Sequence, residues 1–119
     1  MQTKETQRPT GRLEVLDLSI HAIEVLRPVV TRVFRCDRDL GEQLRRALTS
    51  VALNIGEGDH SQGGHRVARF STAAGSCSES RAGLRVAVAW GYVQRSDVEA
   101  GEQLLDRVAA MLHRLGARR

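Results

Sequence analysis

Three polar residues recur at helical spacing within the otherwise apolar segment ALTSVALNIGEG. They are Ser50, Asn54 and Glu57. Asn54 follows Ala47 and Val51 at helical intervals, so it shares a side with apolar residues, where its amide needs hydrogen-bond partners. Glu79 raises the same question in a later apolar-rich segment. Two carboxylates in apolar surroundings are a common means of acid–base catalysis, so this chemistry has to be considered first.

We interpret these residues as a structural hydrogen-bond network, because catalysis also requires a substrate pocket that the sequence does not indicate. Arginine can satisfy a carboxylate through a bidentate contact. The candidate partners are Arg45, Arg46, Arg69 and Arg81. The network is predicted to comprise Ser50, Asn54, Glu57, Glu79, Arg45 and Arg46. No residue is predicted to be catalytic, and the alternative left open is an enzyme that uses Glu57 and Glu79.

Metal ligands and phosphate-binding loops are the other chemical groups to consider. Four potential metal ligands fall within nine residues, namely Glu57, Asp59, His60 and His65. Their spacing matches no zinc signature and no cysteine joins them, so we predict no metal site. The stretch GEGDHSQGGHR lacks the GxxxxGKS/T motif, and no GxSxG motif is present. No cofactor is therefore expected, and residues 56–64 are expected to form a glycine-rich loop.

Arginine provides 17 of the 18 basic side chains, and it is concentrated in the second half of the chain. Residues 107–119 contain four arginines and no acid, and residues 60–92 contain four arginines and one acid. Guanidinium groups bind phosphates well, so this surface is predicted to bind nucleic acid. The predicted binding residues are Arg66, Arg69, Arg81, Arg85, Arg114, Arg118 and Arg119. The alternative is a solvated basic face without a ligand.

The composition restricts the class of protein. A chain of 119 residues with 41% apolar and 27% charged residues is expected to form one soluble domain. Only 3% of the residues are aromatic, which argues against RNA-binding sheets and OB barrels, because both stack bases on several rings. Cys36 and Cys77 are far apart, so reduced thiols and a cytoplasmic location are expected. No membrane span or signal peptide is recognisable.

The apolar periodicity predicts four helices joined by short connections, without strands or internal repeats. The predicted ranges are approximately residues 13–35, 39–56, 64–90 and 96–115. This pattern is typical of an all-α fold, an antiparallel up-down-up-down four-helix bundle. The bundle is predicted to occupy residues 13–116, between a flexible N-terminal tail of residues 1–12 and a basic C-terminal end of residues 117–119.

Local signals mark the ends of several predicted helices. Asp39 with Glu42 fits a capping box at the start of the second helix, and Ser96 with Glu99 fits one at the start of the fourth. Gly91 is the expected end of the third helix. These signals leave only short connections between the helices.

The first predicted helix carries more apolar surface than one bundle core needs. Apart from Ser19, Arg27 and Arg32, every residue of 13–35 outside a single solvent stripe is apolar. A second buried face explains this excess, because the same surface on a monomer would promote aggregation. The protein is therefore predicted to form a homo-oligomer.

Three sequence blocks resemble a bacterial family of four-helix bundles that was first noticed as reading frames in intervening sequences of 23S ribosomal RNA. The blocks are LRRALTSVALNIGEG, RVARFSTAAGSCSE and GLRVAVAWGYV. Their most specific part is the SxxxNIxEG pattern from Ser50 to Gly58. The resemblance extends from about Leu13 to Leu115, and the family is also similar to accessory variability proteins of diversity-generating retroelements.

The resemblance implies an antiparallel bundle that assembles into a ring, commonly a pentamer, and it implies no catalytic activity. The retroelement proteins have a basic surface and work with a reverse transcriptase and its RNA. Together with the arginine distribution, this resemblance leads us to expect a homo-oligomer that binds nucleic acid, with structured RNA and a reverse transcriptase as candidate partners. The alternative is a protein-interaction adaptor whose partner docks on apolar helix surface and whose charge is incidental.

Overall fold

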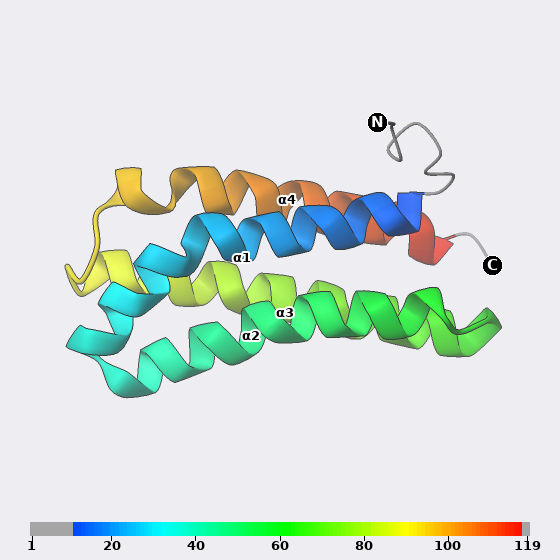
Figure 1. The fold of residues 1–119 in the computed structure, drawn as a ribbon, viewed down its shortest axis with the longest axis horizontal. Coiled ribbons are helices and arrows are strands. Elements are labelled where there is room, and N and C mark those ends of the chain that lie inside the picture. The colour runs from blue at the N-terminus through cyan, green and yellow to red at the C-terminus, as the bar shows by residue number, and fades with distance from the viewer. Residues whose placement is uncertain (1–10, 118–119) are drawn as a thin grey trace, which may run out of the picture.

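The computed structural model describes residues 11–117 of the chain. Four α-helices account for almost all of this part (Figure 1). They are α1 (Gly11–Cys36), α2 (Arg38–Asp59), α3 (Gly63–Ala89) and α4 (Arg95–Ala117). The predicted all-α four-helix fold is therefore confirmed, while most of the predicted N-terminal tail, with Arg118 and Arg119, lies outside the described residues. Across residues 11–117, no helix combines the length and hydropathy that a bilayer crossing requires.

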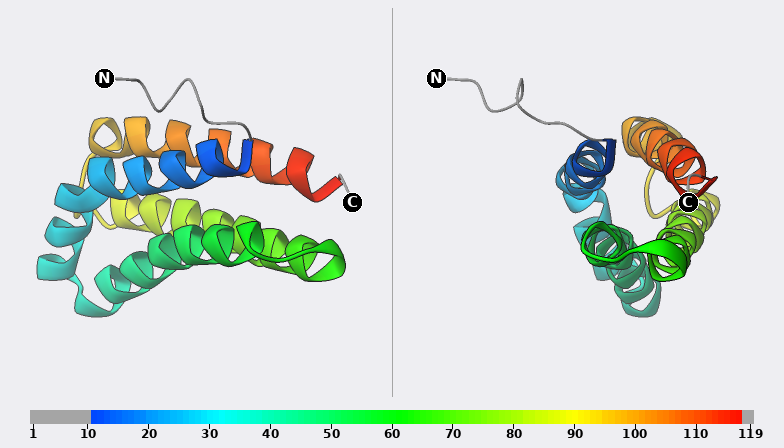
Figure 2. Two further views of the ribbon diagram at one scale, coloured as in Figure 1. Left: turned by 45° about the vertical axis from the view of Figure 1, so that its right-hand side comes forward. Right: turned by 90° about the vertical axis from the view of Figure 1, so that its right-hand side faces the viewer.

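Each helix runs antiparallel to the one before it, and the four helices surround one core (Figures 1 and 2). α1 packs on α2, α2 on α3 and α3 on α4, while α4 returns to pack on α1. The α1–α2 and α3–α4 connections lie at one end of the bundle, which we call the connection end (Figure 1). The α2–α3 connection lies at the opposite end. Residues that are far apart in the sequence are thereby brought together at each end.

The inner side of α1 illustrates how the apolar periodicity builds the core. Its buried residues follow one another at intervals of three or four positions, and Val15, Ala22, Leu26 and Val33 are completely buried. Ser19 lies in the same line, and its hydroxyl donates to the Leu16 carbonyl oxygen at 2.7 Å, which satisfies the only polar group there. Each fully buried aliphatic side chain contributes about 1.5–3 kcal/mol relative to an exposed one. This one side of α1 therefore anchors the helix to the bundle.

The start of α2 differs from the prediction. Asp37, not Asp39, is the N-cap residue, because its Oδ1 accepts a hydrogen bond from the Leu40 amide at 3.1 Å. A single residue separates α1 from α2, so the cap lies two positions earlier than the predicted capping box. The hydroxyl of Tyr92 donates to the Oδ2 of the same carboxylate at 3.1 Å. Asp37 therefore joins the two connections at the connection end.

The predicted loop over residues 56–64 is also mostly helical. α2 continues to Asp59 and α3 begins at Gly63, which leaves three residues between the two helices. Gly58 is buried, and a Cβ atom there would lie 2.5 Å from Cε1 of Phe70. The glycine at this position is required because α3 packs closely against the last turn of α2. Its presence indicates tight helix packing and not a loop.

The start of α4 also needs a correction. α4 begins at Arg95, and the Oδ2 of Asp97 accepts a hydrogen bond from the Gln94 amide at 2.9 Å. In the predicted capping box, the side chain of Glu99 contacts the backbone amide at the start of the helix. In the structure, the side chain of Asp97 makes this contact. The prediction for Gly91 is correct, because this residue follows the end of α3 and has a φ of +81°, which glycine adopts without strain.

Candidate nucleic-acid interface

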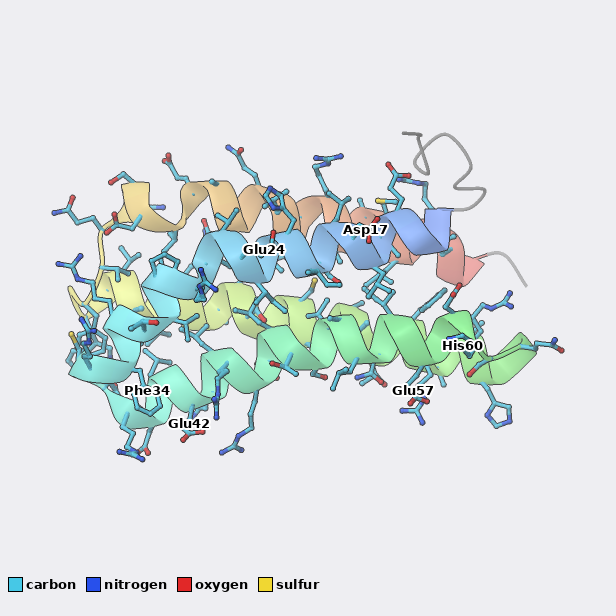
Figure 3. All side chains as sticks on the ribbon, viewed as in Figure 1. Asp17, Glu24, Phe34, Glu42, Glu57 and His60 are labelled. Atoms are coloured by element: carbon cyan, nitrogen blue, oxygen red, sulfur yellow. The ribbon has the colours of Figure 1, made fainter. Side chains whose placement is uncertain are left out.

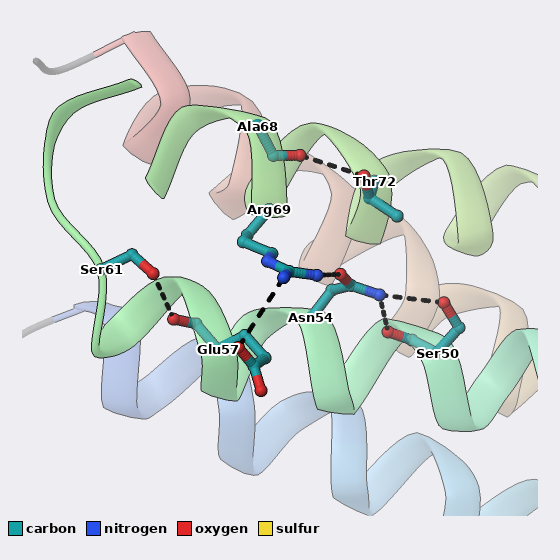
Figure 4. A network of polar contacts seen from close by, with 7 residues as sticks. All are labelled: Ser50, Asn54, Glu57, Ser61, Ala68, Arg69 and Thr72. Carbon is teal, nitrogen blue, oxygen red and sulfur yellow. Dashed lines mark hydrogen bonds and ion pairs between the residues drawn. The ribbon is translucent and has the colours of Figure 1, made fainter. Parts of the chain in front are cut away.

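A polar network joins α2 to α3 in the half of the bundle near the α2–α3 connection. The hydroxyl groups of Ser50 and Ser76 are hydrogen-bonded at 2.7 Å. The Nδ2 of Asn54 donates to the carbonyl oxygen of Ser50 at 2.9 Å and to its Oγ at 3.1 Å (Figure 4). Ser76 is buried and Asn54 is half-buried, so these bonds satisfy groups that water reaches poorly.

Arg69 of α3 continues this network toward solvent. Its Nη1 donates to Oδ1 of Asn54 at 3.4 Å, and its Nη2 lies 3.9 Å from Oε1 of Glu57 (Figure 4). The side chains of Arg69 and Glu57 are 51% and 64% exposed, so this ion pair contributes about 1 kcal/mol at most. The structure thus brings Ser50, Asn54 and Glu57 together, with Ser76 and Arg69 as their partners from α3.

Three residues assigned to the network lie elsewhere. Arg45 and Arg46 point to solvent from α2, and their guanidinium groups lie 4.0 and 3.9 Å from Oε1 of Glu42. Glu42 itself projects from the outer edge of α2 (Figure 3). Glu79 is exposed on α3 and forms no hydrogen bond or ion pair within residues 11–117. The inward positions of these helix segments are occupied by Leu44, Ala47, Leu48, Ser76 and Ser80, which leaves the charged residues outside.

Removing the central amide of the network tests its structural role. Asn54→Ala should lower the free energy of unfolding by about 1 kcal/mol, because the two hydrogen bonds to Ser50 and the long one from Arg69 are lost, while alanine regains part of this through helix propensity. Thr72→Ala is the matched control, since it removes an exposed hydrogen bond to the Ala68 carbonyl oxygen and should change stability by less than about 0.5 kcal/mol. Urea unfolding followed by circular dichroism measures the free energy of unfolding of both variants. Equal stabilities of Asn54→Ala and Thr72→Ala would contradict the structural role of the network.

The described residues do not assemble a cluster of potential metal ligands, and the thiol of Cys77 is not an activated nucleophile. Within residues 11–117, no three His, Cys, Asp or Glu side chains converge on a common point. Burial raises the pKa of the Cys77 thiol to about 11, and its Sγ lies 3.7 Å from the Leu105 carbonyl oxygen. Cys77 is therefore protonated at neutral pH and belongs to the core.

Several arginines predicted to bind nucleic acid are engaged within the chain. Arg66 donates through Nε and Nη2 to the Ser61 carbonyl oxygen at 3.1 and 2.9 Å, which fixes the α2–α3 connection. Nη1 of Arg81 donates to Oδ1 of Asp106 at 2.7 Å and links α3 to α4. Arg69 belongs to the polar network described above. These three guanidinium groups hold helices together, which leaves them fewer free N–H groups for a phosphate.

Other arginines are exposed and form no ion pair within the described residues. Two of them, Arg85 and Arg114, belong to the predicted set. Arg107 lies two turns before Arg114 on the outward side of α4, and residues 107–117 contain no acid. We call Arg107 and Arg114 the α4 arginine strip.

A second group of unpaired arginines lies on α1 and was missed from the sequence. Arg27, Arg32 and Arg35 line a shallow hollow of about 570 Å³ with Pro28 and Thr31, and we call these three arginines the α1 arginine strip. Their segment VLRPVVTRVFRC contains no acid. The positive charge of this segment is visible in the sequence, but it is concealed when the charges of the whole first half of the chain are summed.

The acids that border the α1 arginine strip are already engaged. Glu24 contacts Nδ1 of His21 at 3.3 Å, and Asp37 accepts hydrogen bonds from Leu40 and Tyr92. No ion pair with Arg27, Arg32 or Arg35 forms within residues 11–117, so the strip presents three guanidinium groups to solvent. A polyanion with spaced phosphates is the ligand that such a surface fits.

An apolar groove separates the outer flanks of α1 and α2. We call it the α1–α2 groove, and its apolar lining residues are Leu16, Ile20, Ile23, Ala52 and Leu53. It has a volume of about 660 Å³, and Glu57 and His60 lie at its end near the α2–α3 connection (Figure 3). Ile20 is 42% exposed and Leu53 is 63% exposed. Part of the excess apolar surface of the first helix thus remains uncovered in a single chain.

Comparisons with known proteins agree with the observed fold. A solved structure from Bacteroides thetaiotaomicron VPI-5482, described as a protein with unknown function from the S23 ribosomal protein family, is similar over 91% of this chain and 99% of that chain, with a TM-score of 0.77. The two sequences are 18% identical, so this likeness concerns the fold alone. A search among curated proteins found no match. The family model of the 23S rRNA-intervening sequence protein matches residues 12–114, which is nearly the whole bundle, and the chain therefore belongs to this family.

Proposed function

We propose that this protein is a non-enzymatic, self-associating helical bundle that binds structured RNA through exposed guanidinium groups of α1 and α4. The observation that carries the proposal is the α1 arginine strip, whose three guanidinium groups face solvent without a partner in the described residues. The α4 arginine strip adds two more on the neighbouring helix, which packs against α1. The connection of the family with 23S rRNA intervening sequences supports RNA as the polyanion.

Recognition of this kind depends on charge and shape. The helices present no continuous stacking platform, because only four of the 119 residues are aromatic. Structured RNA is recognised largely through its phosphates and 2′-hydroxyls, which rigid helices with spaced arginines can contact. Binding should therefore show a strong salt dependence and little preference for sequence.

Neutralising the α1 arginine strip tests the proposal. The variant Arg27→Gln, Arg32→Gln, Arg35→Gln should bind a structured RNA hairpin at least about tenfold more weakly at low salt, because three phosphate contacts are lost. Gel-shift titration of wild-type and variant proteins measures the change. The residues are exposed, so the melting temperature should remain close to that of the wild type.

A charge-matched control separates position from net charge. The variant Gln43→Glu, Ala68→Glu, Ser71→Glu alters the net charge by the same three units at exposed positions of α2 and α3. Its RNA affinity should fall much less than that of the strip variant. Equal losses in both variants would show that overall charge and not the α1 surface governs binding, and no binding by the wild type at low salt would refute the proposal.

The α1–α2 groove supports self-association as the second part of the proposal. Its exposed residues Ile20 and Leu53 are large and apolar, and they lie together between two neighbouring helices. Covering them with another copy removes this surface from water, at about 25 cal/mol for each Å² of apolar area. Assembly also repeats the arginine strips around the axis of the oligomer, which strengthens binding to an extended RNA.

A further inference from the structure

Trp90 has the most exposed large apolar side chain in the described part of the protein, at 69%. It is the only tryptophan of the chain, and it caps the C-terminal end of α3. Tryptophan usually stabilises a fold by burying its large ring, and this ring buries little. Folding of the single chain therefore does not explain why an indole occupies this position.

The turn after α3 holds this ring in a defined place. The Tyr92 amide donates to the Ala87 carbonyl oxygen at 3.0 Å, and the Gly91 amide donates to the Val88 carbonyl oxygen at 2.9 Å. These are the two hydrogen bonds of a Schellman motif, and the positive φ of Gly91 permits them. The backbone around Trp90 is thus fixed at the connection end.

The ring of Tyr92 supports the indole from one side. Its hydroxyl donates to Oδ2 of Asp37, the residue that caps α2. Desolvation and this contact with Asp37 raise the pKa of Tyr92, so the phenol keeps the proton that it donates. The ring of Trp90 stacks on Tyr92 with centroids 6.4 Å apart and planes inclined by 18°. The indole therefore has a rigid support and still presents most of its surface to solvent.

Two guanidinium groups lie beside the last turn of α3, which ends at the residue before Trp90. Arg85 of α3 and Arg95 of α4 line a hollow of about 320 Å³ with Ala89, the residue that precedes Trp90. Neither arginine forms an ion pair within residues 11–117. Glu102 also lines the hollow. Two guanidinium groups can hold a phosphate, and a carboxylate can accept a hydrogen bond from a ribose hydroxyl, so the hollow offers groups for both parts of a nucleotide backbone.

We propose that Trp90 stacks on an unpaired base of a bound RNA while Arg85 and Arg95 hold the backbone of the same strand. The inference rests on the proposed RNA binding and deepens it, because it assigns a single-stranded segment to the connection end and leaves the paired regions to the arginine strips. Every base has a π-face, so stacking on one indole does not require a particular sequence. The phosphate-binding groups at the same end of α3 favour a nucleotide over an apolar protein partner.

The fluorescence of Trp90 provides a direct test, because no other tryptophan contributes to the signal. A short oligouridylate should quench this fluorescence on binding, and a blunt-ended RNA duplex of similar length should bind with little quenching. Trp90→Leu should weaken oligouridylate binding by about 5- to 150-fold, the range associated with one stacked base, and should leave duplex binding unchanged. Trp90→Phe should retain most of the affinity, because its ring can still stack.

Three other outcomes would overturn the inference, and each shows which step of it is wrong. If Trp90→Leu binds oligouridylate as tightly as the wild type, the stacking role is wrong although RNA binding itself stands. If neither RNA binds at low salt, the inference and the proposed function both fail. If Trp90→Leu retains its RNA affinity but changes the mass measured by light scattering, the ring belongs to an interface between proteins. Because Trp90 is exposed, its replacement should change the free energy of unfolding by less than about 0.5 kcal/mol, which thermal melting verifies.

Discussion

Replacing Leu53 by aspartate is expected to convert the proposed homo-oligomer into single chains of 13.1 kDa. Leu53 is 63% exposed and lies beside Ile20 in the α1–α2 groove. In an interface that covers the groove, the new carboxylate would be buried without a partner, at a cost of several kcal/mol. In a single chain the same side chain points to solvent, so the fold should be retained. Light scattering coupled to size-exclusion chromatography measures the mass of both proteins.

The matched control for this substitution is Val86→Asp. Val86 is a 43% exposed apolar residue of α3 that does not line the groove. Both substitutions place an aspartate at an exposed apolar position of a helix. Any general effect of aspartate on helix stability is therefore the same in the two variants. The control should keep the wild-type mass. An unchanged mass for Leu53→Asp, or an equal loss of association in the control, would show that copies do not meet through the α1–α2 groove.

Gly41→Ala is expected to cause the largest loss of stability, at least about 3 kcal/mol. A Cβ atom at position 41 would lie 2.5 Å from Cα of Phe34 and 2.9 Å from its backbone nitrogen. The obstacle is the main chain of α1, which cannot rotate away as a flexible side chain could. A single residue links the two helices, so α2 cannot easily shift to restore the distance. Urea unfolding followed by circular dichroism gives the difference in free energy.

Gly75→Ala is the control for this effect. Gly75 is exposed in the interior of α3, and a Cβ atom there would have no neighbouring heavy atom within 4 Å. The substitution should raise the free energy of unfolding by up to about 1 kcal/mol, because alanine favours the helix. The changes in the free energy of unfolding of Gly41→Ala and Gly75→Ala are therefore expected to have opposite signs. If Gly41→Ala is as stable as the wild type, the close approach of α1 and α2 at the connection end is wrong.

The helices could be predicted from the sequence because an apolar period of three to four residues is a local property. The inward residues of α1, such as Val15, Leu26 and Val33, follow directly from this period. The exact ends of the helices could not be predicted in the same way. Asp37 and Asp39 are both good capping residues, and the choice between them depends on how closely α1 and α2 approach each other. Similarly, Gly58 resembles a loop residue until the position of Phe70 is known.

Only the part of the candidate site that lies within a single helix could be predicted from the sequence. Spacing within α2 identified Ser50 and Asn54 as groups that need partners, but it contains no information on how α3 is rotated. Arg69 was among the candidate partners of Glu57, and the rotation of α3 selects it over Arg45, Arg46 and Arg81. The same rotation places Ser76 against α2 and leaves Glu79 in solvent. Pairs between helices, which engage some arginines and leave others unpaired, are equally invisible in a count of charges along the chain.

The most direct test of the account is the salt dependence of RNA binding by the wild-type protein. Titrations with an RNA hairpin between about 50 and 200 mM salt should show the logarithm of the binding constant falling linearly with the logarithm of the salt concentration. Neutralising the α1 arginine strip should make this slope less steep by about 2 to 3, roughly one unit for each lost phosphate contact. A binding constant that does not change with salt, or identical slopes for wild type and variant, would contradict the proposal that these guanidinium groups bind the RNA backbone.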